Sequence, residues 1–292
     1  RTRPGVLSRF FISAMAELHC GRFRLPLARP LIMGIVNLTP DSFSGDGTGT
    51  DVERALGLAQ MQLEAGADIL DLGAESSRPG AMHTPEAEEL RRLLPVLQEV
   101  AGWGIPVSVD TYKPAVMRAA LDAGASMIND ISALRHPGAM DAVATGGCAI
   151  CLMHMQGEPR SMQAAPRYGD VVAEVQAFLV DRVAACRLAG IDVRRLVLDP
   201  GLGFGKSLEH NLALLSGLTA TGCAGLPLLA GISRKSMLGA ITGRQVGDRL
   251  AASIAAALLA VQNGAKIVRV HDVAETRDAL AVLAAVETGS VG

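Results

Sequence analysis

A short stretch in the second half of the chain combines a carboxylate with a glycine-rich loop. The apolar run 196–198 predicts a strand that ends at Asp199, and Pro200 stops it because proline lacks the N–H that would extend the ladder. Glycines follow at 201, 203 and 205, where the backbone can adopt positive φ and approach a ligand closely. Pro200 stands where a P-loop needs its first glycine, and the G-x-G-x-G spacing differs from the dinucleotide fingerprint. The stretch therefore predicts a site of another kind.

Other short apolar runs along the chain also end at polar side chains. These side chains are Asn37, Asp71 with Glu75, Asp110, Asn129 with Asp130, His154, Ser233 to Ser236, and Arg269 with His271 and Asp272. A single Asp or Asn at a strand end is more often a turn former than a ligand contact. A set of acidic and basic side chains at successive strand ends, however, indicates a binding site. We expect Asp130 and Asp272 to be structural, while His154 is equally compatible with the core and with the site.

One group of these residues suits a flat heterocycle. Carboxylates accept pairs of N–H bonds, as they do from a guanidinium, and an amide both donates and accepts. An amino–N–H edge of a ring would therefore be bound in the barrel centre by Asp110, Asn129 and Asp199, with Lys235 nearby.

A second group suits a phosphate or pyrophosphate. Arg269, His271 and Asn37 offer donors with no carboxylate among them. The sequence contains no second acidic cluster that could form an all-protein metal cage. A Mg²⁺ ion held by Asn37 and by substrate phosphates is compatible with the reluctance of Mg²⁺ to lose its waters.

The elements that must position these residues repeat along the chain. Strands are predicted at 31–36, 68–72, 106–110, 126–129, 148–153, 196–199, 227–231 and 266–270, with helical patterns between them. Strands and helices in this alternation predict a single (β/α)₈ TIM barrel, in which the strand ends meet at one mouth. An open doubly wound sheet is the alternative. The segment 18–27 alternates around Gly21 and predicts a short N-terminal hairpin, and Thr84 with Pro85 predicts a helix N-cap.

Composition excludes several function classes. The 292 residues are 49% hydrophobic and only 3% aromatic, with a net charge of −2, so we expect no nucleic-acid partner. The longest apolar run, 250–261, is too short to span a membrane. Five cysteines give no disulfide framework, which indicates the cytoplasm. We expect one domain over 15–292, with translation beginning at Met15 and residues 1–14 forming a disordered or non-native extension.

With these residues in place, the chain resembles the dihydropteroate synthase family of the folate pathway. The matching stretches are MGIVNLTPDSFS (33–44), DLGAESSRPG (71–80), SVDT (108–111), INDI (128–131), LDPGLGFGK (198–206), ISRKS (232–236) and RVHD (269–272). They occur in the family's order and span nearly the whole chain. One of them alone would be moderate evidence, whereas all of them in order are very specific.

The resemblance implies a transferase that condenses 6-hydroxymethyl-7,8-dihydropterin pyrophosphate with 4-aminobenzoate, releasing pyrophosphate and 7,8-dihydropteroate. It implies Mg²⁺ as cofactor and a homodimer. The implied pterin ligands are Asp110, Asn129, Asp199, Lys235 and Arg269. The implied pyrophosphate ligands are Asn37, Arg269 and His271, with the metal at Asn37, and the implied aminobenzoate contacts are Ser77, Arg78, Pro79, Phe204 and Ser236. Asp110, Lys235, Arg269 and His271 would be the catalytic residues.

Two departures from the family pattern concern the loops. Ser77 stands where the family commonly has Thr, and Ser44-Gly-Asp-Gly47 replaces the usual Ser-Asp-Gly-Gly. Both bear on aminobenzoate affinity and loop order, and neither removes a charge. The rivals are a corrinoid methyltransferase-type pterin barrel, which should lack the Ser-Ser-Arg-Pro and Arg-x-His stretches, and a non-catalytic pterin-binding paralogue, which should have degraded loops. A phosphosugar barrel enzyme explains the anion group only.

Overall fold

Eight parallel strands form a closed barrel. The computed structural model describes residues 15–39, 52–76 and 81–290. The strands are β3 (Leu31–Asn37), β4 (Ile69–Gly73), β5 (Val107–Asp110), β6 (Met127–Asp130), β7 (Ala149–Met153), β8 (Leu196–Asp199), β9 (Leu228–Ala230) and β10 (Ala265–Val270). Each pairs with the next, and β10 pairs with β3 to close the ring. The predicted barrel is confirmed, and the open sheet is excluded.

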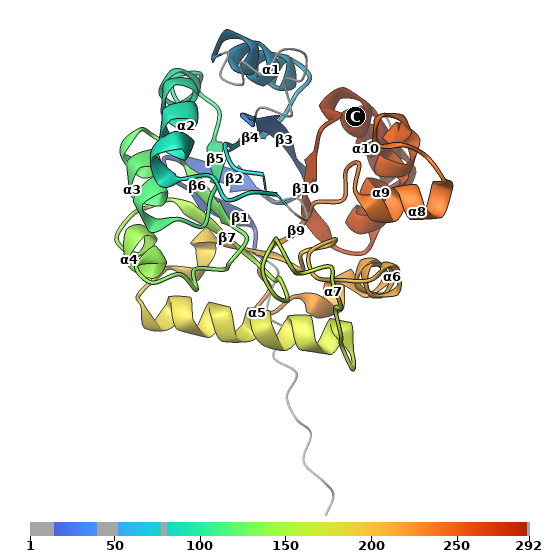
Figure 1. Cartoon of the computed structure of the whole chain (residues 1–292). Coiled ribbons are helices and arrows are strands. Elements are labelled where there is room, and N and C mark those ends of the chain that lie inside the picture. The colour runs from blue at the N-terminus through green and yellow to red at the C-terminus, as the bar shows by residue number, and fades with distance from the viewer. Residues whose placement is uncertain (1–14, 40–51, 77–80, 291–292) are drawn as a thin grey trace, which may run out of the picture.

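Helices follow the strands and surround the barrel (Figure 1). They are α1 (Val52–Glu64), α2 (Glu86–Val100), α3 (Pro114–Asp122), α4 (Ala139–Ala144), α5 (Val171–Leu188), α6 (Leu208–Ser216), α7 (Leu218–Thr221), α8 (Ser236–Thr242), α9 (Leu250–Gln262) and α10 (Val273–Thr288), with the 3₁₀ turns η2 (Val193–Arg195) and η3 (Val246–Asp248). The predicted Thr84 cap is wrong, because Pro85 occupies the N-cap of α2. The Thr84 N–H instead donates to Glu75 Oε1, at 2.8 Å.

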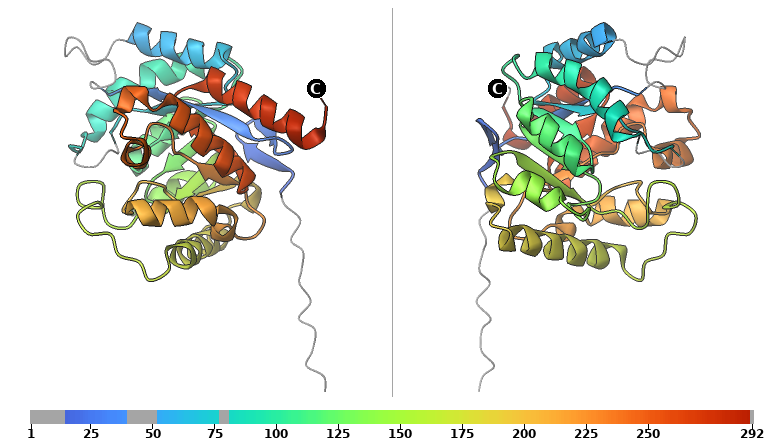
Figure 2. Two further views of the ribbon diagram at one scale, coloured as in Figure 1. Left: turned by 90° about the vertical axis from the view of Figure 1, so that its right-hand side faces the viewer. Right: turned by 60° about the vertical axis from the view of Figure 1, so that its left-hand side comes forward.

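The predicted N-terminal hairpin closes one end of the barrel. Strands β1 (Glu17–Cys20) and β2 (Phe23–Pro26) pair antiparallel around Gly21, whose φ of 60° suits glycine in the turn. Leu18 and Cys20 are fully buried and belong to the same apolar cluster as the barrel interior. Figure 2 shows the hairpin at one end of the molecule and the long segment between β7 and α5 toward the other.

The barrel interior is layered by the two-residue period of its strands. Ile69, Met127, Val197 and Ile267 lie in the apolar cluster above the hairpin. Two residues further along the same strands stand Asp71, Asn129, Asp199 and Arg269. Residues i and i+2 of a strand point to the same side, so these polar groups also face the interior. The barrel interior therefore has an apolar layer next to the hairpin and a polar layer at the carboxyl ends of the strands.

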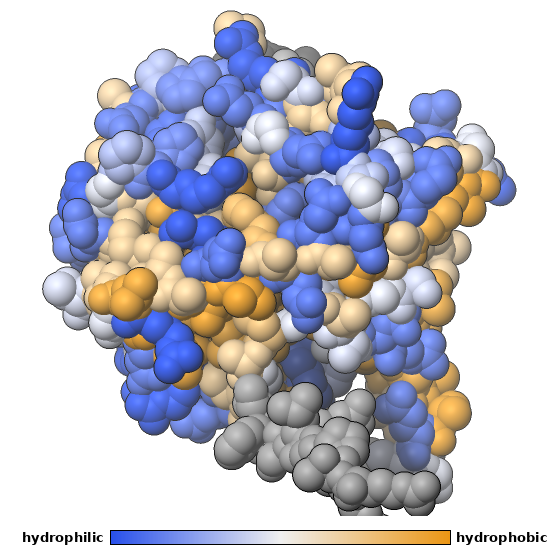
Figure 3. Space-filling model, turned by 90° about the horizontal axis from the view of Figure 1, so that it is seen from below, coloured by the Kyte–Doolittle hydropathy of each residue, from blue (hydrophilic) through white to orange (hydrophobic). Residues whose placement is uncertain are grey.

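Figure 3 views the molecule from the side of α5, and hydrophilic and hydrophobic residues are intermixed on this face. Scattered exposed apolar side chains, such as Val180 and Leu188 of α5, are ordinary on a protein surface. Across the described ranges, none of the helices is both long and apolar enough to span a bilayer. All five cysteines are free thiols.

Candidate active site

The barrel mouth gathers the polar residues that the sequence singles out. Asn37, Asp110 and Asp199 end their strands, and Asn129 is the penultimate residue of β6. Arg269 lies on β10, His271 follows that strand, and Lys235 lies in the loop between β9 and α8. Ser77, Arg78 and Pro79 lie outside the described residues.

Arg269 joins the two predicted groups instead of belonging to one. Its Nε donates to Asp71 Oδ2 at 2.6 Å, and its Nη2 donates to Asp110 Oδ2 at 3.0 Å. The prediction that the anion-binding donors have no carboxylate among them is therefore wrong for this residue. The barrel closes between β10 and β3, which brings Arg269 within reach of acids on β4 and β5. A single guanidinium thus links β10 with β4 and β5.

Asp71 is a strand-end residue that the sequence analysis noted but to which it assigned no role in the site. Its side chain has 0% exposure, and its Oδ2 also accepts from Asn129 Nδ2 at 3.4 Å. Its other oxygen, Oδ1, has no hydrogen-bond partner among the described residues. The two-residue period of the strands could have identified it. Asp71 stands two residues after the buried Ile69, just as Asn129 and Asp199 stand two residues after the buried Met127 and Val197.

Burial and neighbouring charges shift the pKa values of this layer. Burial raises the pKa of Asp110, Arg269 opposes that rise, and the nearby Asp71 carboxylate adds to it. Burial also raises the pKa of Asp199, against the effect of Lys235. The pKa of Lys235 falls to about 8, again because of burial, although Asp199 favours its charged form. Such opposed shifts in one cleft are typical of functional sites.

The glycine-rich loop has the backbone geometry that its sequence predicts. Gly201, Gly203 and Gly205 all have positive φ, at 68°, 84° and 61°. A Cβ on Gly201 would overlap the carbonyl oxygen of His154, and one on Gly205 would overlap that of Gln156. The Gly201 N–H donates to Asp199 Oδ1 at 2.7 Å. The loop therefore packs against the chain after β7 and fixes the Asp199 carboxylate.

Lys206 stabilises this loop by hydrogen bonds to its backbone carbonyls. Its Nζ lies 3.0 Å from His154 Nδ1 and donates to the carbonyls of Gly201 and Phe204, each at 2.9 Å. Burial lowers the pKa of His154 to about 3, with a smaller contribution from Lys206, so the ring is a neutral acceptor. Burial also lowers the pKa of Lys206 to about 7. His154 is therefore a buried residue that supports the glycine-rich loop through Lys206. Of the two alternatives left open by the sequence, the core and the site, the structure places its ring in the core beneath the site.

Lys235 lies beside Phe204, which is a residue of this loop. Lys235 Nζ donates to the carbonyl of Leu202 and lies 4.7 Å from the centroid of the Phe204 ring. Phe204 also packs on a small apolar cluster of Ile131, Met153, Met155 and Met162. This apolar wall was not predicted from the sequence. It offers a flat ring a non-polar surface beside the polar layer.

Apolar and polar groups also line a large open cavity on the β4 to β7 side of the mouth. Its volume is about 880 Å³, and its lining includes Asp110, Ile131, Met155, Tyr112 and Lys113. Asp110 and Ile131 therefore connect the polar layer with this cavity. The space is ample for a ligand of the size of a small drug.

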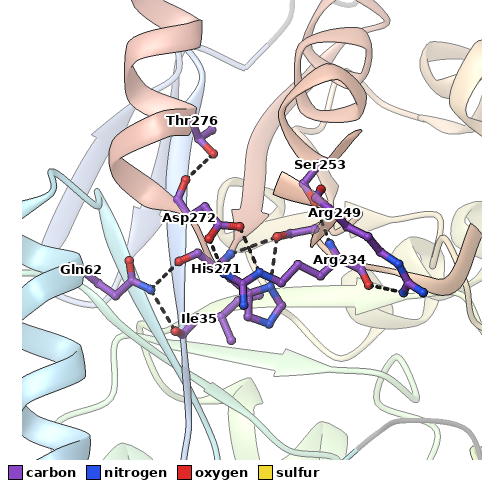
Figure 4. Close-up of polar contacts among 9 residues, drawn as sticks. Ile35, Gln62, Arg234, Arg249, Ser253, His271, Asp272 and Thr276 are labelled. Atoms are coloured by element: carbon purple, nitrogen blue, oxygen red, sulfur yellow. Dashed lines mark hydrogen bonds and ion pairs between the residues drawn. The ribbon is translucent and has the colours of Figure 1, made fainter. Parts of the chain in front are cut away.

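The β9 and β10 exits form a separate polar cluster (Figure 4). The His271 ring Nδ1 lies 3.0 Å from Ser233 Oγ, and Gln62 Nε2 donates to the His271 carbonyl at 2.9 Å. Asp272 forms an ion pair with Arg234, whose Nε lies 3.1 Å from Asp272 Oδ2. Asp272 is therefore structural, as expected. Ser236, the first residue of α8, is exposed at the rim.

Asp130 is structural, as expected. Its two carboxylate oxygens accept the backbone N–H groups of Ser132 and Leu134, both at 2.7 Å.

The donors around Asn37 suit a hard cation that keeps other ligands. Asn37 Oδ1 and Asp110 Oδ2 lie 3.8 and 3.9 Å from the position that a Cβ on Gly73 would occupy. The missing side chain at Gly73 thus leaves space lined by an amide oxygen and a carboxylate oxygen. No group of three or more His, Cys, Asp or Glu residues in the described ranges could hold a metal. These residues fit a Mg²⁺ ion only if a substrate and water supply most of its ligands.

Comparison with known proteins gives the family. Residues 33–271 match the family described as pterin binding enzyme. This chain is a pterin-binding enzyme. It is 48% identical over 262 residues to dihydropteroate synthase of Escherichia coli K12, an alignment that covers 89% of this chain and 93% of that protein.

Solved structures of dihydropteroate synthases share the fold of this pterin-binding enzyme. The Burkholderia cenocepacia protein, complexed with 7,8-dihydropteroate, is 50% identical with a TM-score of 0.87, covering 95% of this chain and 98% of that one. The Xanthomonas albilineans protein with 4-aminobenzoic acid is 53% identical with a TM-score of 0.88, covering 94% and 99%. All three of these similar proteins are dihydropteroate synthases, which counts against the methyltransferase reading.

Proposed function

We propose that the chain is a dihydropteroate synthase. It condenses 6-hydroxymethyl-7,8-dihydropterin pyrophosphate with 4-aminobenzoate to give 7,8-dihydropteroate and pyrophosphate. The observation that carries this proposal is the similarity, at 50% identity over 95% of the chain, to a synthase complexed with that product. The polar layer of Asp110, Asn129, Asp199 and Lys235 supports it, because such a layer is what a pterin ring requires.

The pterin ring is held by acceptors that come from three different strands, β5, β6 and β8. Asp199 accepts from the amino–N–H edge of the ring, while Asn129 and Asp110 bind its other polar atoms. The apolar wall of Ile131 and Met153 contacts the ring face. Burial raises the pKa of both carboxyls, and ligand N–H groups that donate to them favour their ionised forms.

The reaction breaks the C–O bond between the pterin methylene and the pyrophosphate and forms a C–N bond to the arylamine. Negative charge develops on the departing pyrophosphate, and Arg269, His271 and Asn37 stabilise it. Positive charge develops on the pterin, beside the Asp110 carboxylate. The amine attacks as a neutral nucleophile and then loses a proton to solvent, so no strong general base is required. Positioning of the two substrates supplies most of the remaining rate.

A Mg²⁺ ion would be held by Asn37, with the space beside Gly73 and the Asp110 carboxylate next to it. Bound there, it would neutralise charge on the pyrophosphate. The aminobenzoate ring would lie beside Phe204 and Lys235, with Ser236 and the segment 77–79 completing its site.

We also propose a cytoplasmic homodimer. The helices α9 and α10 carry exposed apolar side chains, namely Leu250, Leu259, Val282 and Val286. Groups of this kind along adjacent helices are suited to a second copy of the chain. Sedimentation equilibrium of the whole chain should give twice the monomer mass, and a monomer at micromolar concentration would contradict the proposal.

A pyrophosphate-release assay tests the proposed reaction. Release should require the pterin pyrophosphate, 4-aminobenzoate and Mg²⁺ together, and 7,8-dihydropteroate should form one-for-one with pyrophosphate. Pyrophosphate release that is independent of 4-aminobenzoate would indicate a hydrolase. Tight pterin binding with no turnover would indicate the non-catalytic paralogue.

A further inference from the structure

Asp71 is a fully buried carboxylate that contacts two proposed ligand-binding residues from different strands. Its Oδ2 accepts from Arg269 Nε at 2.6 Å and from Asn129 Nδ2 at 3.4 Å. We propose that Asp71 is a positioning residue that orients Arg269 and Asn129 for the pterin pyrophosphate. This inference rests on the proposed function, and it adds a residue that touches neither substrate.

The Arg269 side chain needs such an anchor. A long arginine side chain has many rotamers, and a ligand must overcome the entropy of ordering them unless the protein has already fixed the side chain. Asp71 and Asp110 each hold one nitrogen, Nε and Nη2. Within the described part of the chain, Nη1 donates to no residue, so it remains available to an anion. The side chain is 21% exposed, which leaves it accessible from the mouth.

The two acids that hold Arg269 are not equivalent. Asp110 is 14% exposed and belongs to the proposed pterin contacts, so a bound ligand competes for it. Asp71 has 0% exposure, and every hydrogen bond it accepts within the described ranges comes from a side chain. It therefore continues to hold Arg269 when a ligand engages Asp110.

Asn129 is oriented by the same oxygen. An amide group can turn by 180°, which exchanges its donor and its acceptor. An ionised carboxylate can only accept, so Asp71 selects the orientation in which the Asn129 nitrogen faces it. The amide oxygen of Asn129 is then left to accept from a pterin N–H.

Asp130 provides a matched comparison on β6, two strands along the barrel from the β4 strand of Asp71. It is also a buried carboxylate, but both of its oxygens accept backbone N–H groups, from Ser132 and Leu134. Asp130 therefore holds a turn, whereas Asp71 holds two side chains. The proposal predicts different consequences for the same Asp-to-Asn change at these two positions.

Calorimetric titration with 6-hydroxymethyl-7,8-dihydropterin pyrophosphate tests the proposal. Asp71→Asn keeps the shape and one oxygen but removes the charge, and it should weaken binding by about ten- to a hundred-fold. Asp71→Ala should weaken it further, since both hydrogen bonds are lost. Asp130→Asn should change the Kd less than about threefold while lowering the melting temperature.

A double-mutant cycle separates positioning from stability. In an Arg269→Ala or an Asn129→Ala background, Asp71→Asn should cost several-fold less affinity than it does in the wild type. Equal losses in all backgrounds, or a folded Asp71→Asn variant with wild-type Kd, would overturn the proposal. Circular dichroism identifies variants that fail to fold. If Asp71→Ala does not fold, the test uses Asp71→Asn alone. If the wild type does not bind the pterin pyrophosphate at all, the proposed function fails instead.

Discussion

The two halves of the barrel mouth are held together by different forces. On the β4, β5 and β10 side, Asp71, Arg269 and Asp110 are fixed by ion pairs between side chains. On the β7 to β9 side, Asp199 is fixed by the backbone of the glycine loop, and Lys206 in turn holds that loop by its carbonyls. We call these the ionic half and the glycine half.

This difference determines what each half tolerates. The ionic half depends on charge balance, because it contains two acids and one guanidinium in a buried layer. The glycine half depends on space, because carbonyl oxygens occupy the positions where side chains would stand at Gly201 and Gly205. A substitution that changes charge should therefore disturb the first half most, and one that adds a methyl group should disturb the second.

Removal of the guanidinium should have the largest effect. Arg269→Ala leaves Asp71 and Asp110 buried without their counter-ion, and we expect a loss of about 3–5 kcal/mol in unfolding free energy. Urea unfolding measures this. Arg234→Ala is the control, since the Arg234–Asp272 pair is more exposed and should contribute at most about 1 kcal/mol. Equal losses in the two variants would show that the ionic half is not held by charge.

Addition of one methyl group tests the glycine half. Gly201→Ala combines positive-φ strain of about 1–2 kcal/mol with overpacking of about 1–3 kcal/mol against His154. We expect a loss of about 3 kcal/mol in unfolding free energy. Gly190→Ala is the control, because Gly190 also has positive φ, at 79°, but nothing lies within 4 Å of its added Cβ. The control should lose only the strain contribution, and a similar loss in both variants would remove the steric argument.

The buried ammonium of Lys206 should give the glycine half a distinct pH dependence. Its pKa in the folded protein is about 7, below the ordinary value of 10.5, because burial disfavours the charge. Between these values the unfolded chain binds the extra proton, so stability should rise with pH through this window, by at most about 1.4 kcal/mol per unit. Below pH 7 Lys206 is protonated in both the folded and the unfolded chain, so its contribution to stability no longer changes with pH. Lys206→Met should lack this slope when unfolding midpoints are compared from pH 7 to 10, and identical slopes would contradict the assignment.

The sequence was sufficient to predict the barrel, the hairpin and most of the polar layer. Strand ends in a barrel meet at one mouth, so Asp110, Asn129, Asp199 and Arg269 could be placed at the same mouth without coordinates, although Arg269 was assigned to a separate anion-binding group. The pairing of Arg269 with Asp71 could not be predicted from the residue types. The two lie 198 positions apart, and each had many other possible ion-pair partners in the sequence. The apolar wall was missed for a similar reason, since Met155 and Met162 lie in the segment after β7, which carries no strand or helix pattern.

Binding of free 6-hydroxymethylpterin to Asp199→Ala tests the account most directly, because the account holds that both halves bind one pterin ring. The carboxylate on the glycine half is then absent while the ionic half is intact. Each charged hydrogen bond lost should cost about 1.5–3 kcal/mol, so calorimetry should show affinity reduced at least about tenfold, or abolished. Wild-type affinity in a folded Asp199→Ala variant would contradict the claim, since the ionic half alone would then suffice.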